Sequence, residues 1–408
     1  MIKKKLGMDV FTASKKRIEW VFDTFNKVYV SFSGGKDSTA MMHLIMDEAK
    51  KRNKNVGVLF IDWECQFDAT IDHVRNIYAI YKENIEPFWV QLEILTNNAS
   101  SMFEPIWKSW DEKKKELWTR EKEYIGTIKT KKYFPFYYND ITFEEFVPLF
   151  AKWYSQGEET ACFVGIRAQE SLNRFRVVAR SNEFKHSDRK YTTNVVDNVW
   201  NIYPMYDWKA DDIWIYYTKF KKPYNQIYDR MYMAGLTINQ MRIDEPFGDE
   251  ARKNLWLYHI LEPKTWARFV ARMEGINSGA LYSEEKGNIL GNVRISLPEG
   301  HSWESFSNHI LDTMPPQTAE HYKNKITVYL KWYRDRGYPD GIPDQADYRL
   351  EQLGKVPAWR QIAKTILRND YWCRGLGFGI TKSSNYNKYM DLMKRRRKTW
   401  NIFPDIKE

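Results

Sequence analysis

The chain has 408 residues, and its 63 lysines and arginines outnumber its 53 acidic residues, which gives a formal net charge of +10. A chain of this length can bury a sizeable core and is typical of two domains, and its basic balance favours anionic partners, either a nucleotide or a nucleic acid. No stretch is long and apolar enough to span a membrane and the basic N-terminus has no apolar segment after it, so we expect a cytoplasmic protein.

The first part of the chain alternates between predicted helices and strands. Apolar side chains recur at helical spacing or in short continuous runs. They predict, in chain order, a helix over 15–25, a strand over 28–32, a helix over 39–50, a strand over 56–61, a helix over 67–81, a strand over 88–92, a helix over 142–154 and strands over 161–166 and 200–205. Thr142 and Glu145 have the spacing of a capping box at the start of the last of these helices. Strands joined by helices in this way predict an α/β fold built on a doubly wound parallel sheet.

Two parts of the chain depart from this alternation. Residues 101–141 are rich in charged and aromatic side chains, and we interpret them as an insertion at the carboxyl edge of the sheet. The aromatic run over 131–138 either stacks on unpaired bases or belongs to the core, where large apolar side chains usually lie. We predict one domain over 1–220 and a mainly helical domain over 221–408. The helices predicted there cover 223–234, 251–261, 264–273, 318–336 and 358–367, and a loop is predicted over 296–316.

The most informative motif is the loop between the first predicted strand and the second predicted helix, Ser33-Gly34-Gly35-Lys36-Asp37-Ser38. Adjacent glycines let several backbone N–H groups approach an anion, and the start of a helix adds the positive end of its dipole. Ser33 and Ser38 add hydroxyl donors, and Lys36 adds a charge. The Asp37 carboxylate can cap the helix or hold a magnesium ion. The loop and the preceding Ser31 are therefore candidate ligands of a pyrophosphate group; the alternative is an ordinary Gly-Gly turn that binds nothing.

Carboxylates follow the second predicted strand. Asp62 and Glu64 come directly after it, and the carboxyl edge of a doubly wound sheet faces the ligand. These side chains either accept hydrogen bonds from ribose hydroxyls or adenine, or only cap the next helix. A later cluster either ligates magnesium, acts as a general base or stabilises a helix N-terminus. It consists of Arg242, Asp244, Glu245, Asp249, Glu250 and Arg252.

A basic motif follows the strand predicted over 161–166. Arg167 comes one residue beyond this strand, after Gly165, so its guanidinium projects at the same edge of the sheet and can grip a phosphate or sulfate through two hydrogen bonds. Arg174 lies seven residues later, on the same face of a helix, and Glu170 is spaced to orient both arginines. The alternative is a set of ion pairs on a helix surface.

These motifs resemble a known superfamily. The loop resembles the pyrophosphate loop of the adenine-nucleotide alpha-hydrolases, and the segment over 165–171 is similar to the Gly-x-Arg-x-x-Glu-Ser signature of phosphoadenosine phosphosulfate reductases. A second motif, which consists of Pro204, Trp208, Asp212 and Trp214, resembles the element that follows this signature in the same family. The second half, notably 223–225, 241–252 and 314–316, resembles the branch typified by the immunoglobulin-binding regulator A proteins. The resemblance implies an adenine-nucleotide alpha-hydrolase-like sheet that binds an adenine nucleotide.

The cysteines depart from the reductase pattern. Cys65, Cys162 and Cys373 are scattered and form no Cys-x-x-Cys pair, so we expect neither a disulfide framework, a zinc site nor an iron–sulfur cluster. Sulfonucleotide reductases carry a nucleophilic cysteine in a C-terminal Glu-Cys-Gly tail, which this chain lacks. Cys373 is the last cysteine, and the charge of Arg374 beside it can lower its pKa. We nevertheless interpret Cys373 as structural, because the residues around it do not match that tail.

The leading hypothesis is a magnesium-dependent enzyme that cleaves the α–β phosphate bond of ATP, releasing pyrophosphate and adenylating an acceptor or yielding AMP. Lys36, Asp37 and Arg167 are the candidate catalytic residues. One alternative is an enzyme that binds adenylyl sulfate (APS) or its 3′-phosphorylated form (PAPS) and reduces or transfers the sulfur. Another is a nucleotide-sensing regulator acting with DNA or with a ParB-like protein, because members of the resembling branch are often found beside such a partner. The basic run over 394–398, before Trp400, either contacts nucleic acid or is a solvated helix face.

Overall fold

A computed structural model describes residues 7–101, 104, 106–122, 126–179, 185–248, 255–273, 276, 297–298, 300–312, 316–367, 370 and 373–378. The chain forms two compact units. The first contains residues 1–96, 108–245 and 257–272, and the second contains residues 97–107, 246–256 and 273–408. The first unit therefore includes segments that follow residue 220, where the sequence predicts a domain boundary.

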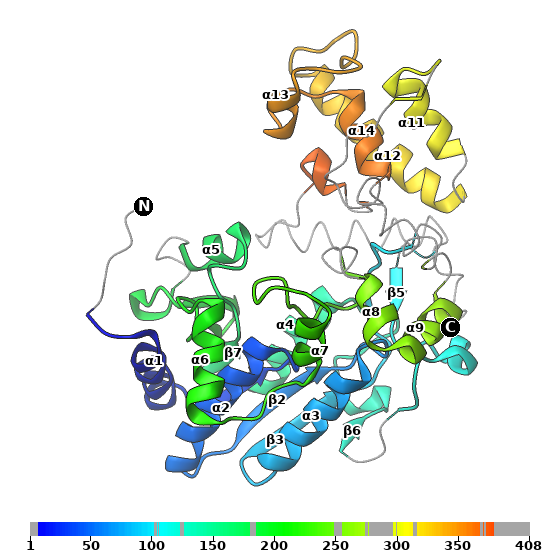
Figure 1. Ribbon diagram of the computed structural model, residues 1–408. Helices are drawn as coiled ribbons and strands as arrows, with labels where there is room; N and C mark the ends of the chain where they lie inside the picture. Colours follow the sequence, from blue (N-terminus) through cyan, green and yellow to red (C-terminus); the bar gives the residue numbers. More distant parts are fainter. Residues whose placement is uncertain are drawn as a thin grey trace. The chain divides into compact units, whose positions relative to one another are not determined.

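A seven-stranded sheet organises the first unit, with the strand order β6-β3-β2-β1-β7-β9-β8 (Figure 1). Its strands are β1 (Lys27–Ser31), β2 (Val56–Ile61), β3 (Ile85–Val90), β6 (Thr127–Ile128), β7 (Thr160–Val164), β8 (Thr192–Val196) and β9 (Val199–Ile202). All neighbouring strands are parallel except β8 and β9, which are antiparallel. The predicted α/β fold with a mostly parallel sheet is confirmed.

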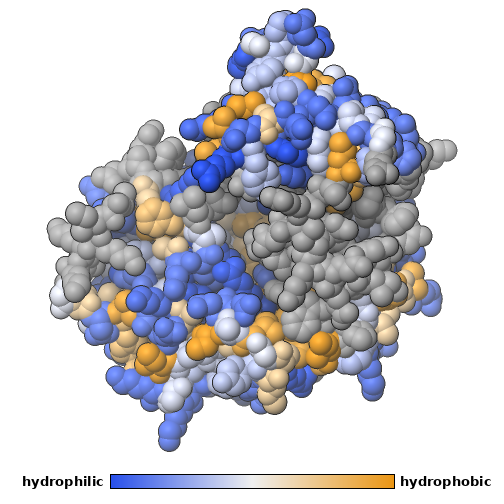
Figure 2. Space-filling model, turned by 45° about the horizontal axis from the view of Figure 1, so that its top comes forward, coloured by the Kyte–Doolittle hydropathy of each residue, from blue (hydrophilic) through white to orange (hydrophobic). Residues whose placement is uncertain are grey.

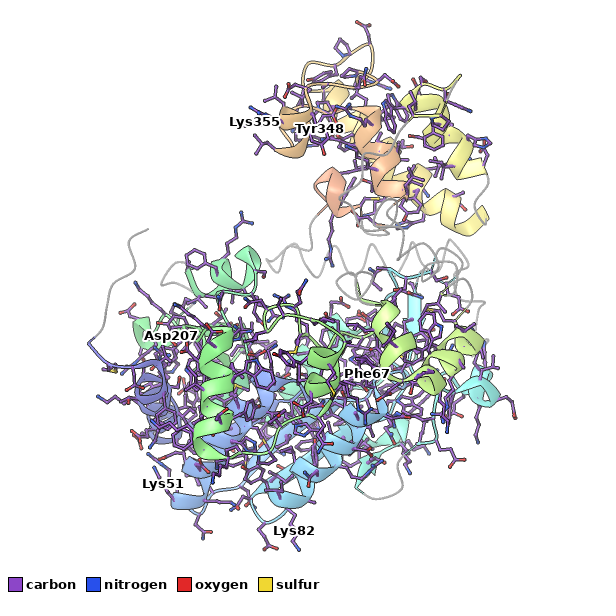
Figure 3. The ribbon with its side chains drawn as sticks, viewed as in Figure 1. Lys51, Phe67, Lys82, Asp207, Tyr348 and Lys355 are labelled. Carbon is purple, nitrogen blue, oxygen red and sulfur yellow. The ribbon has the colours of Figure 1, made fainter. Side chains whose placement is uncertain are left out.

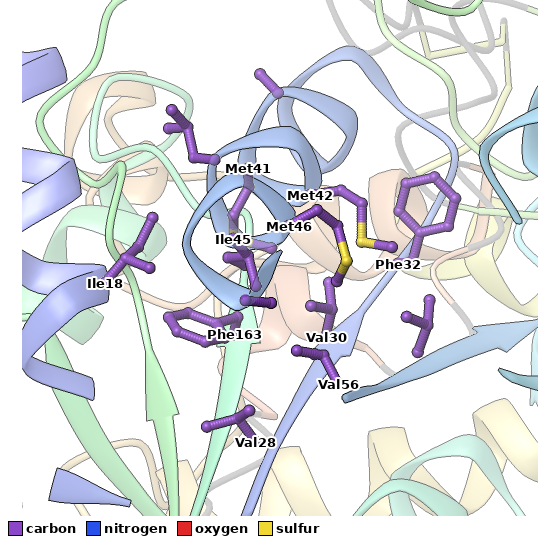
Figure 4. Packing of buried hydrophobic residues seen from close by; sticks show 14 of the residues in the cluster. Ile18, Val28, Val30, Phe32, Met41, Met42, Ile45, Met46, Val56 and Phe163 are labelled. Atoms are coloured by element: carbon purple, nitrogen blue, oxygen red, sulfur yellow. The ribbon is translucent and has the colours of Figure 1, made fainter. Parts of the chain in front are cut away.

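Helices cover both faces of this sheet. Val28 and Val30 of β1 share a hydrophobic core with α2 (Lys36–Lys51), whose Met42 and Ile45 lie at helical spacing (Figure 4). Tyr29 points to the opposite face because side chains alternate along a strand, and its ring lies 5.4 Å from that of Phe150 in α4 (Phe143–Ser155). The first core also takes side chains from α1 (Val10–Thr24), α3 (Asp68–Ile80) and α6 (Ala210–Phe220). The doubly wound arrangement follows from this two-sided burial.

The segment interpreted as an insertion contributes to the sheet. It supplies β6 at the edge beside β3, and its other elements are β5 (Ile106–Lys108), which pairs with β4 (Leu95–Asn97), and the short 3-10 helices η1 (Glu112–Leu117) and η2 (Lys131–Tyr133). Its aromatic run belongs partly to the core. The Phe134 ring is buried and lies 5.5 Å from that of Phe146, whereas Tyr133 and Tyr138 are exposed. The predicted capping box is confirmed, because the Glu145 carboxylate accepts the Thr142 N–H at 3.0 Å.

Shorter elements complete the first unit. The hairpin of β8 and β9 follows α5 (Leu172–Ala179) and η4 (His186–Asp188), and the helices α7 (Ile227–Met233) and α9 (Pro263–Arg272) lie later in the chain, with α8 (Leu255–Leu261) between them. Lys51 is the last residue of α2, and Lys82 follows the end of α3. Figure 3 shows both side chains pointing outward at one edge of the unit. That edge holds the amino ends of the parallel strands, so the opposite edge, at their carboxyl ends, is where a ligand is expected.

The part of the second unit that follows residue 300 is mainly helical where it is described. Its elements are α11 (Trp303–Asp312), α12 (Pro316–Arg334), α13 (Tyr348–Gln352), α14 (Trp359–Leu367) and the 3-10 helix η6 (Arg374–Leu376). Trp303, Tyr322 and Ile362 belong to its core. The prediction of a loop over 296–316 was wrong for 303–312, because Ser302 accepts the Ser305 N–H at 3.1 Å and thereby caps a helix.

The surface mixes polar and apolar residues. On the face shown in Figure 2, hydrophobic residues form small patches among hydrophilic ones. No helix in the described part of the chain has both the length and the apolar character that a membrane crossing requires.

Candidate functional site

The loop 33–38 lies where the strand order of the sheet reverses. β1 has β2 on one side and β7 on the other, and such a reversal opens a crevice at the carboxyl ends of the strands. Ser31 ends β1 opposite Val164 of β7, so the segments that follow these two strands run side by side. A Cβ atom on Gly165 would lie only 3.2 Å from the backbone of Ser38. Glycine at 165 therefore allows the predicted Arg167 motif to approach the loop.

The loop presents unpaired backbone donors. Gly34 has φ +71°, a conformation that favours glycine, and α2 begins two residues later at Lys36. Within the described part of the chain, the N–H groups of Gly34, Asp37 and Ser38 have no hydrogen-bond partner. The first N–H groups of any helix lack intrahelical acceptors, and together with the helix dipole they favour an anion. The hydroxyls of Ser33 and Ser38 lie 2.9 Å apart beside these groups.

Charged side chains converge on the same loop. The Nε atom of Arg167 lies 2.5 Å from a carboxylate oxygen of Asp37, and the Lys36 ammonium lies 3.3 Å from the same carboxylate. The Lys36 ammonium also donates to the Met241 carbonyl at 2.8 Å. The Arg167 guanidinium is buried and reaches Glu170 at 3.4 Å. The predicted residues of the loop and of the Arg167 motif are thus brought together.

Two further guanidinium groups complete this cluster. Arg174 is paired with Glu170, as the sequence predicts, and Arg242 donates to the Glu170 carbonyl at 3.1 Å. Burial lowers the pKa of the Lys36 ammonium, and the charges of Arg167 and Arg242 lower it further, whereas Asp37 opposes this. The cluster therefore holds four cations around the carboxylates of Asp37 and Glu170, and the charge of a third carboxylate, Asp244, also acts on Arg174. The excess of positive charge favours a bound anion.

Residues after position 210 support the loop backbone. The Tyr217 hydroxyl donates to the Lys36 carbonyl at 2.5 Å, and the Lys36 N–H donates to the Tyr228 hydroxyl at 2.9 Å. The Asn225 amide donates to the Gly34 carbonyl at 3.1 Å and to the Thr70 hydroxyl at 3.0 Å. Neither tyrosine was among the predicted site residues. The only signal near them was the Pro-Tyr-Asn sequence at 223–225, which the sequence analysis used for its resemblance alone.

The second reductase-like element has a structural role here. Trp208 donates to the Ser14 hydroxyl of α1 at 2.7 Å, and the Asp212 carboxylate caps α6 by accepting the Lys209 N–H at 2.7 Å. Nearby, Arg17 forms an ion pair of 2.6 Å with Asp207. These contacts fix α6 against α1, and α6 carries one of the tyrosines that hold the loop.

Asp62 and Glu64 lie in a separate buried network. Asp62 accepts hydrogen bonds from the Trp89 indole at 2.8 Å and from the Gln91 amide at 2.9 Å, and it also pairs with Arg120. Both carboxylates are fully buried, and among the described residues neither contacts the loop 33–38. Asp62 thus ties the end of β2 to β3 and to the insertion.

Glu64 has a different set of partners. The Arg272 guanidinium of α9 donates to its two oxygens at 2.9 and 3.4 Å, and the Trp110 N–H donates at 2.7 Å. Burial raises the pKa of Glu64, whereas Arg272 opposes this shift. Close by, the rings of Phe67 and Tyr258 stack 3.8 Å apart. Glu64 thereby joins β2 to α9 and to the insertion.

The later acidic cluster is only partly described. Asp244 and Glu245 are partly exposed, and burial of the Glu245 carboxyl raises its pKa to about 7. Asp249, Glu250 and Arg252 lie outside the described residues, as does the basic run over 394–398 with Trp400. Among the described residues, no group of three or more histidine, cysteine or acidic side chains could hold a metal ion.

All three cysteines are buried. Burial raises the pKa of the Cys162 thiol and of the Cys373 thiol to about 12, and it raises the pKa of Cys65 well above its usual value. The charge of Arg374 does not bring the pKa of Cys373 below its usual value, because burial dominates. These thiols are poor nucleophiles at neutral pH.

Comparison with known proteins gives two family matches. The family described as "Phosphoadenosine phosphosulfate reductase domain" matches residues 27–234, and a domain of unknown function, DUF3440, matches residues 235–340 and 338–387. The chain is 42% identical over 400 residues to the uncharacterized protein YbdN of Escherichia coli (strain K12), covering 97% of each chain. It is 22% identical over 243 residues to adenosine 5′-phosphosulfate reductase 2 of Bacillus subtilis (strain 168), covering 59% of this chain and 83% of that one.

Among solved structures, one neighbour is a phosphate complex of phosphoadenylyl-sulfate reductase from Candida auris. The match covers 60% of this chain and 97% of the reductase chain, with 17% sequence identity and a TM-score of 0.33. At that score the likeness is weak.

Proposed function

Because the chain belongs to the phosphoadenosine phosphosulfate reductase domain family, we propose that its first unit is an enzyme that binds the phosphate chain of an adenine nucleotide in the loop 33–38. The observation that carries this proposal is the set of unpaired N–H groups of Gly34, Asp37 and Ser38 beside a cluster in which cationic side chains outnumber carboxylates. A phosphate chain supplies both the acceptors and the negative charge that such a site requires.

The reaction we propose is cleavage of the α–β phosphate bond of ATP. An oxygen nucleophile, either water or an acceptor group, attacks the α-phosphorus and forms a new P–O bond. The bond from the α-phosphorus to the bridging oxygen breaks, and pyrophosphate leaves with the electron pair on that oxygen. The N–H groups of the loop, together with Lys36 and Arg167, stabilise the departing charge. The products are pyrophosphate and either AMP or an adenylated acceptor.

The chemistry of the cysteines favours ATP cleavage over reduction of a sulfonucleotide. A protein thiolate must attack sulfur in such a reduction, and a thiol whose pKa lies near 12 is almost entirely protonated at neutral pH. The relation to an adenosine 5′-phosphosulfate reductase keeps APS and PAPS as a second class of ligand. Binding of either compound without reduction is compatible with the same loop.

The surroundings of Asp37 do not fit a magnesium ion held by protein ligands. Its carboxylate is already flanked by Arg167 at 2.5 Å and by Lys36 at 3.3 Å, and two cations beside a ligand disfavour a third. Glu170 is engaged in the same way by Arg167 and Arg174. Neither carboxylate therefore fits as a ligand of the magnesium ion that the sequence predicts. The role that we propose for Asp37 is instead to position Arg167.

The test is calorimetric binding of ATP, APS and PAPS, followed by chromatography of the same mixtures. The disruptive variant is Gly35→Asp, because its Cβ would lie 3.3 Å from Ser33 and 3.4 Å from Tyr228 and would bring a carboxylate into the loop. The control is Gly157→Asp, the same substitution at an exposed turn where the Cβ would meet nothing within 4 Å. Because Gly157 has φ +85°, a conformation that strains other residues, thermal unfolding first checks that this variant is folded. We expect the first variant to abolish ATP binding and the second to retain it.

The products decide between the candidate functions. Release of pyrophosphate from ATP by the wild type supports the proposed reaction. ATP binding without release in the presence of candidate acceptors would overturn it and leave a nucleotide-sensing regulator, for which DNA or a ParB-like protein is the proposed partner. Preference for APS or PAPS would shift the assignment to the second class of ligand. Failure of the wild type to bind any of the three would overturn the whole proposal.

A further inference from the structure

One side chain of α7 reaches the backbone of the loop 33–38. Tyr228 is buried, with 2% of its surface exposed, and its hydroxyl accepts the Lys36 N–H at 2.9 Å. A Cβ atom on Gly35 would lie 3.4 Å from that hydroxyl, and the Lys36 ammonium lies 5.2 Å from the centre of the ring. The hydroxyl therefore lies beside the unpaired N–H groups at the start of α2.

The proton of this hydroxyl is unused. A phenol has one O–H donor and can also accept, and Tyr228 uses its accepting capacity for the Lys36 N–H. Among the described residues, the Tyr228 O–H group donates no hydrogen bond. Burial raises the pKa of Tyr228, and the neighbouring Asp37 raises it further, so the group stays protonated. A buried donor without an acceptor is costly, and the O–H can rotate toward a ligand in the loop.

We propose that Tyr228 contacts the ligand directly, donating its hydroxyl proton to an oxygen of the bound phosphate chain. This inference rests on the proposed function, because it assumes that an anion occupies the loop. The phenol is neutral, so it adds a hydrogen bond where the four cations already supply the charge. It also completes a ring of donors formed by the N–H groups of Gly34, Asp37 and Ser38 and this hydroxyl.

Tyr217 of α6 also contacts the loop and provides a matched comparison. Its hydroxyl donates to the Lys36 carbonyl at 2.5 Å, so its proton is already used by the protein. Tyr217 and Tyr228 are both buried, with 3% and 2% of their surface exposed, and both bind the backbone of Lys36, Tyr217 at its carbonyl and Tyr228 at its N–H. Loss of the Tyr217 hydroxyl removes support for the loop, whereas loss of the Tyr228 hydroxyl removes a contact with the ligand as well.

The experiment compares Tyr228→Phe with Tyr217→Phe, using inorganic pyrophosphate and ATP as the probes and thermal unfolding as the measure of stability. We expect Tyr228→Phe to weaken the binding of both probes by about tenfold to a hundredfold, the range for a hydrogen bond to a charged group. The factor should be the same for pyrophosphate as for ATP, since the hydroxyl meets the phosphate chain. Tyr217→Phe should lower the melting temperature, and it should weaken the binding of each probe several-fold less than Tyr228→Phe does.

Three outcomes would overturn the inference. One is unchanged or tighter binding by Tyr228→Phe, which would show that the hydroxyl only occupies the place of an anion oxygen. The second is an equal loss of affinity in both variants, which would reduce Tyr228 to a support of the loop. The third is a loss for ATP without a loss for pyrophosphate. Should Tyr228→Phe fail to fold, Tyr228→Met removes the same hydroxyl and serves in its place. If the wild type binds neither probe, the proposed function itself has failed.

Discussion

Replacement of Arg272 by methionine should destabilise the first unit through Glu64. The Arg272 guanidinium lies 2.9 and 3.4 Å from the two Glu64 oxygens, and neither side chain is more than 2% exposed. Methionine fills most of the same volume but leaves the carboxylate with backbone donors only, from Trp110 at 2.7 Å and Thr119 at 3.3 Å. Removal of one partner of a buried ion pair costs about 3–5 kcal/mol.

The expected loss depends on pH with a definite sign. Burial already raises the folded pKa of Glu64 above its unfolded value of 4.5, and removal of Arg272 raises the folded value further. A carboxyl whose pKa is higher in the folded state destabilises the fold above its unfolded pKa, and this cost grows as the pH rises. The loss of unfolding free energy in Arg272→Met should therefore be smaller at pH 5 than at pH 7.

Urea unfolding at the two pH values measures this loss. The double variant Arg272→Met with Glu64→Gln removes the buried charge, so it should recover most of the stability, and it also keeps the test valid if the single variant does not fold. ATP affinity of the folded double variant should be close to that of the wild type, because Glu64 does not contact the loop. A loss below about 1 kcal/mol in the single variant, or no recovery in the double variant, would refute the reasoning.

Three further predictions concern Arg167, two buried histidines and Cys373. Arg167→Lys should weaken ATP binding by about tenfold in calorimetry, with little change in melting temperature. An ammonium keeps the charge but lacks the planar guanidinium that reaches both Asp37 and Glu170. Unchanged affinity would count against the candidate site. The pKa values of His43 and His73 are lowered to about 4 by burial, so unfolding free energy should fall as the pH drops from about 6.5 to about 4, by about 3 kcal/mol per histidine. In urea titrations at several pH values, His43→Gln should reduce this fall in unfolding free energy by about half. An unaltered fall would contradict the conclusion that buried, neutral His43 contributes to it. Cys373→Ser should leave ATP turnover unchanged, and loss of activity would instead favour sulfur chemistry at that thiol.

Sequence signals that are local in the chain predicted the core of the fold and the proximity of the loop residues to one another in the candidate site. A buried run, two glycines and a helical apolar face occupy consecutive positions, and they identified β1, the loop and α2 together. Arg167 and Glu170 are three residues apart, so their pairing could also be predicted from spacing. Short elements escaped this reasoning. β6 has two residues, too few to show an alternating pattern, and the register of β8 shifts between Asn194 and Val196.

Long-range partners could not be predicted from spacing. Glu64 and Arg272 are 208 residues apart, and Lys36 and Tyr228 are 192 residues apart. A carboxylate at the end of a strand is equally consistent with a ribose contact and with a buried ion pair, and only the tertiary structure shows which arginine lies beside it. The same limit applies to the unpaired N–H groups, because the sequence states which donors exist and the fold decides which of them find acceptors.

The distance in sequence between the loop and its supports has a consequence for biosynthesis. A ribosome releases β1 and the loop early, but Tyr217, Asn225 and Tyr228, which hold the loop, emerge almost two hundred residues later. Arg272 emerges later still, and until then the Glu64 carboxylate has no guanidinium to accompany it into the interior. Since domains fold as units during synthesis, we expect the nascent chain to acquire nucleotide binding only after residue 272 has left the exit tunnel.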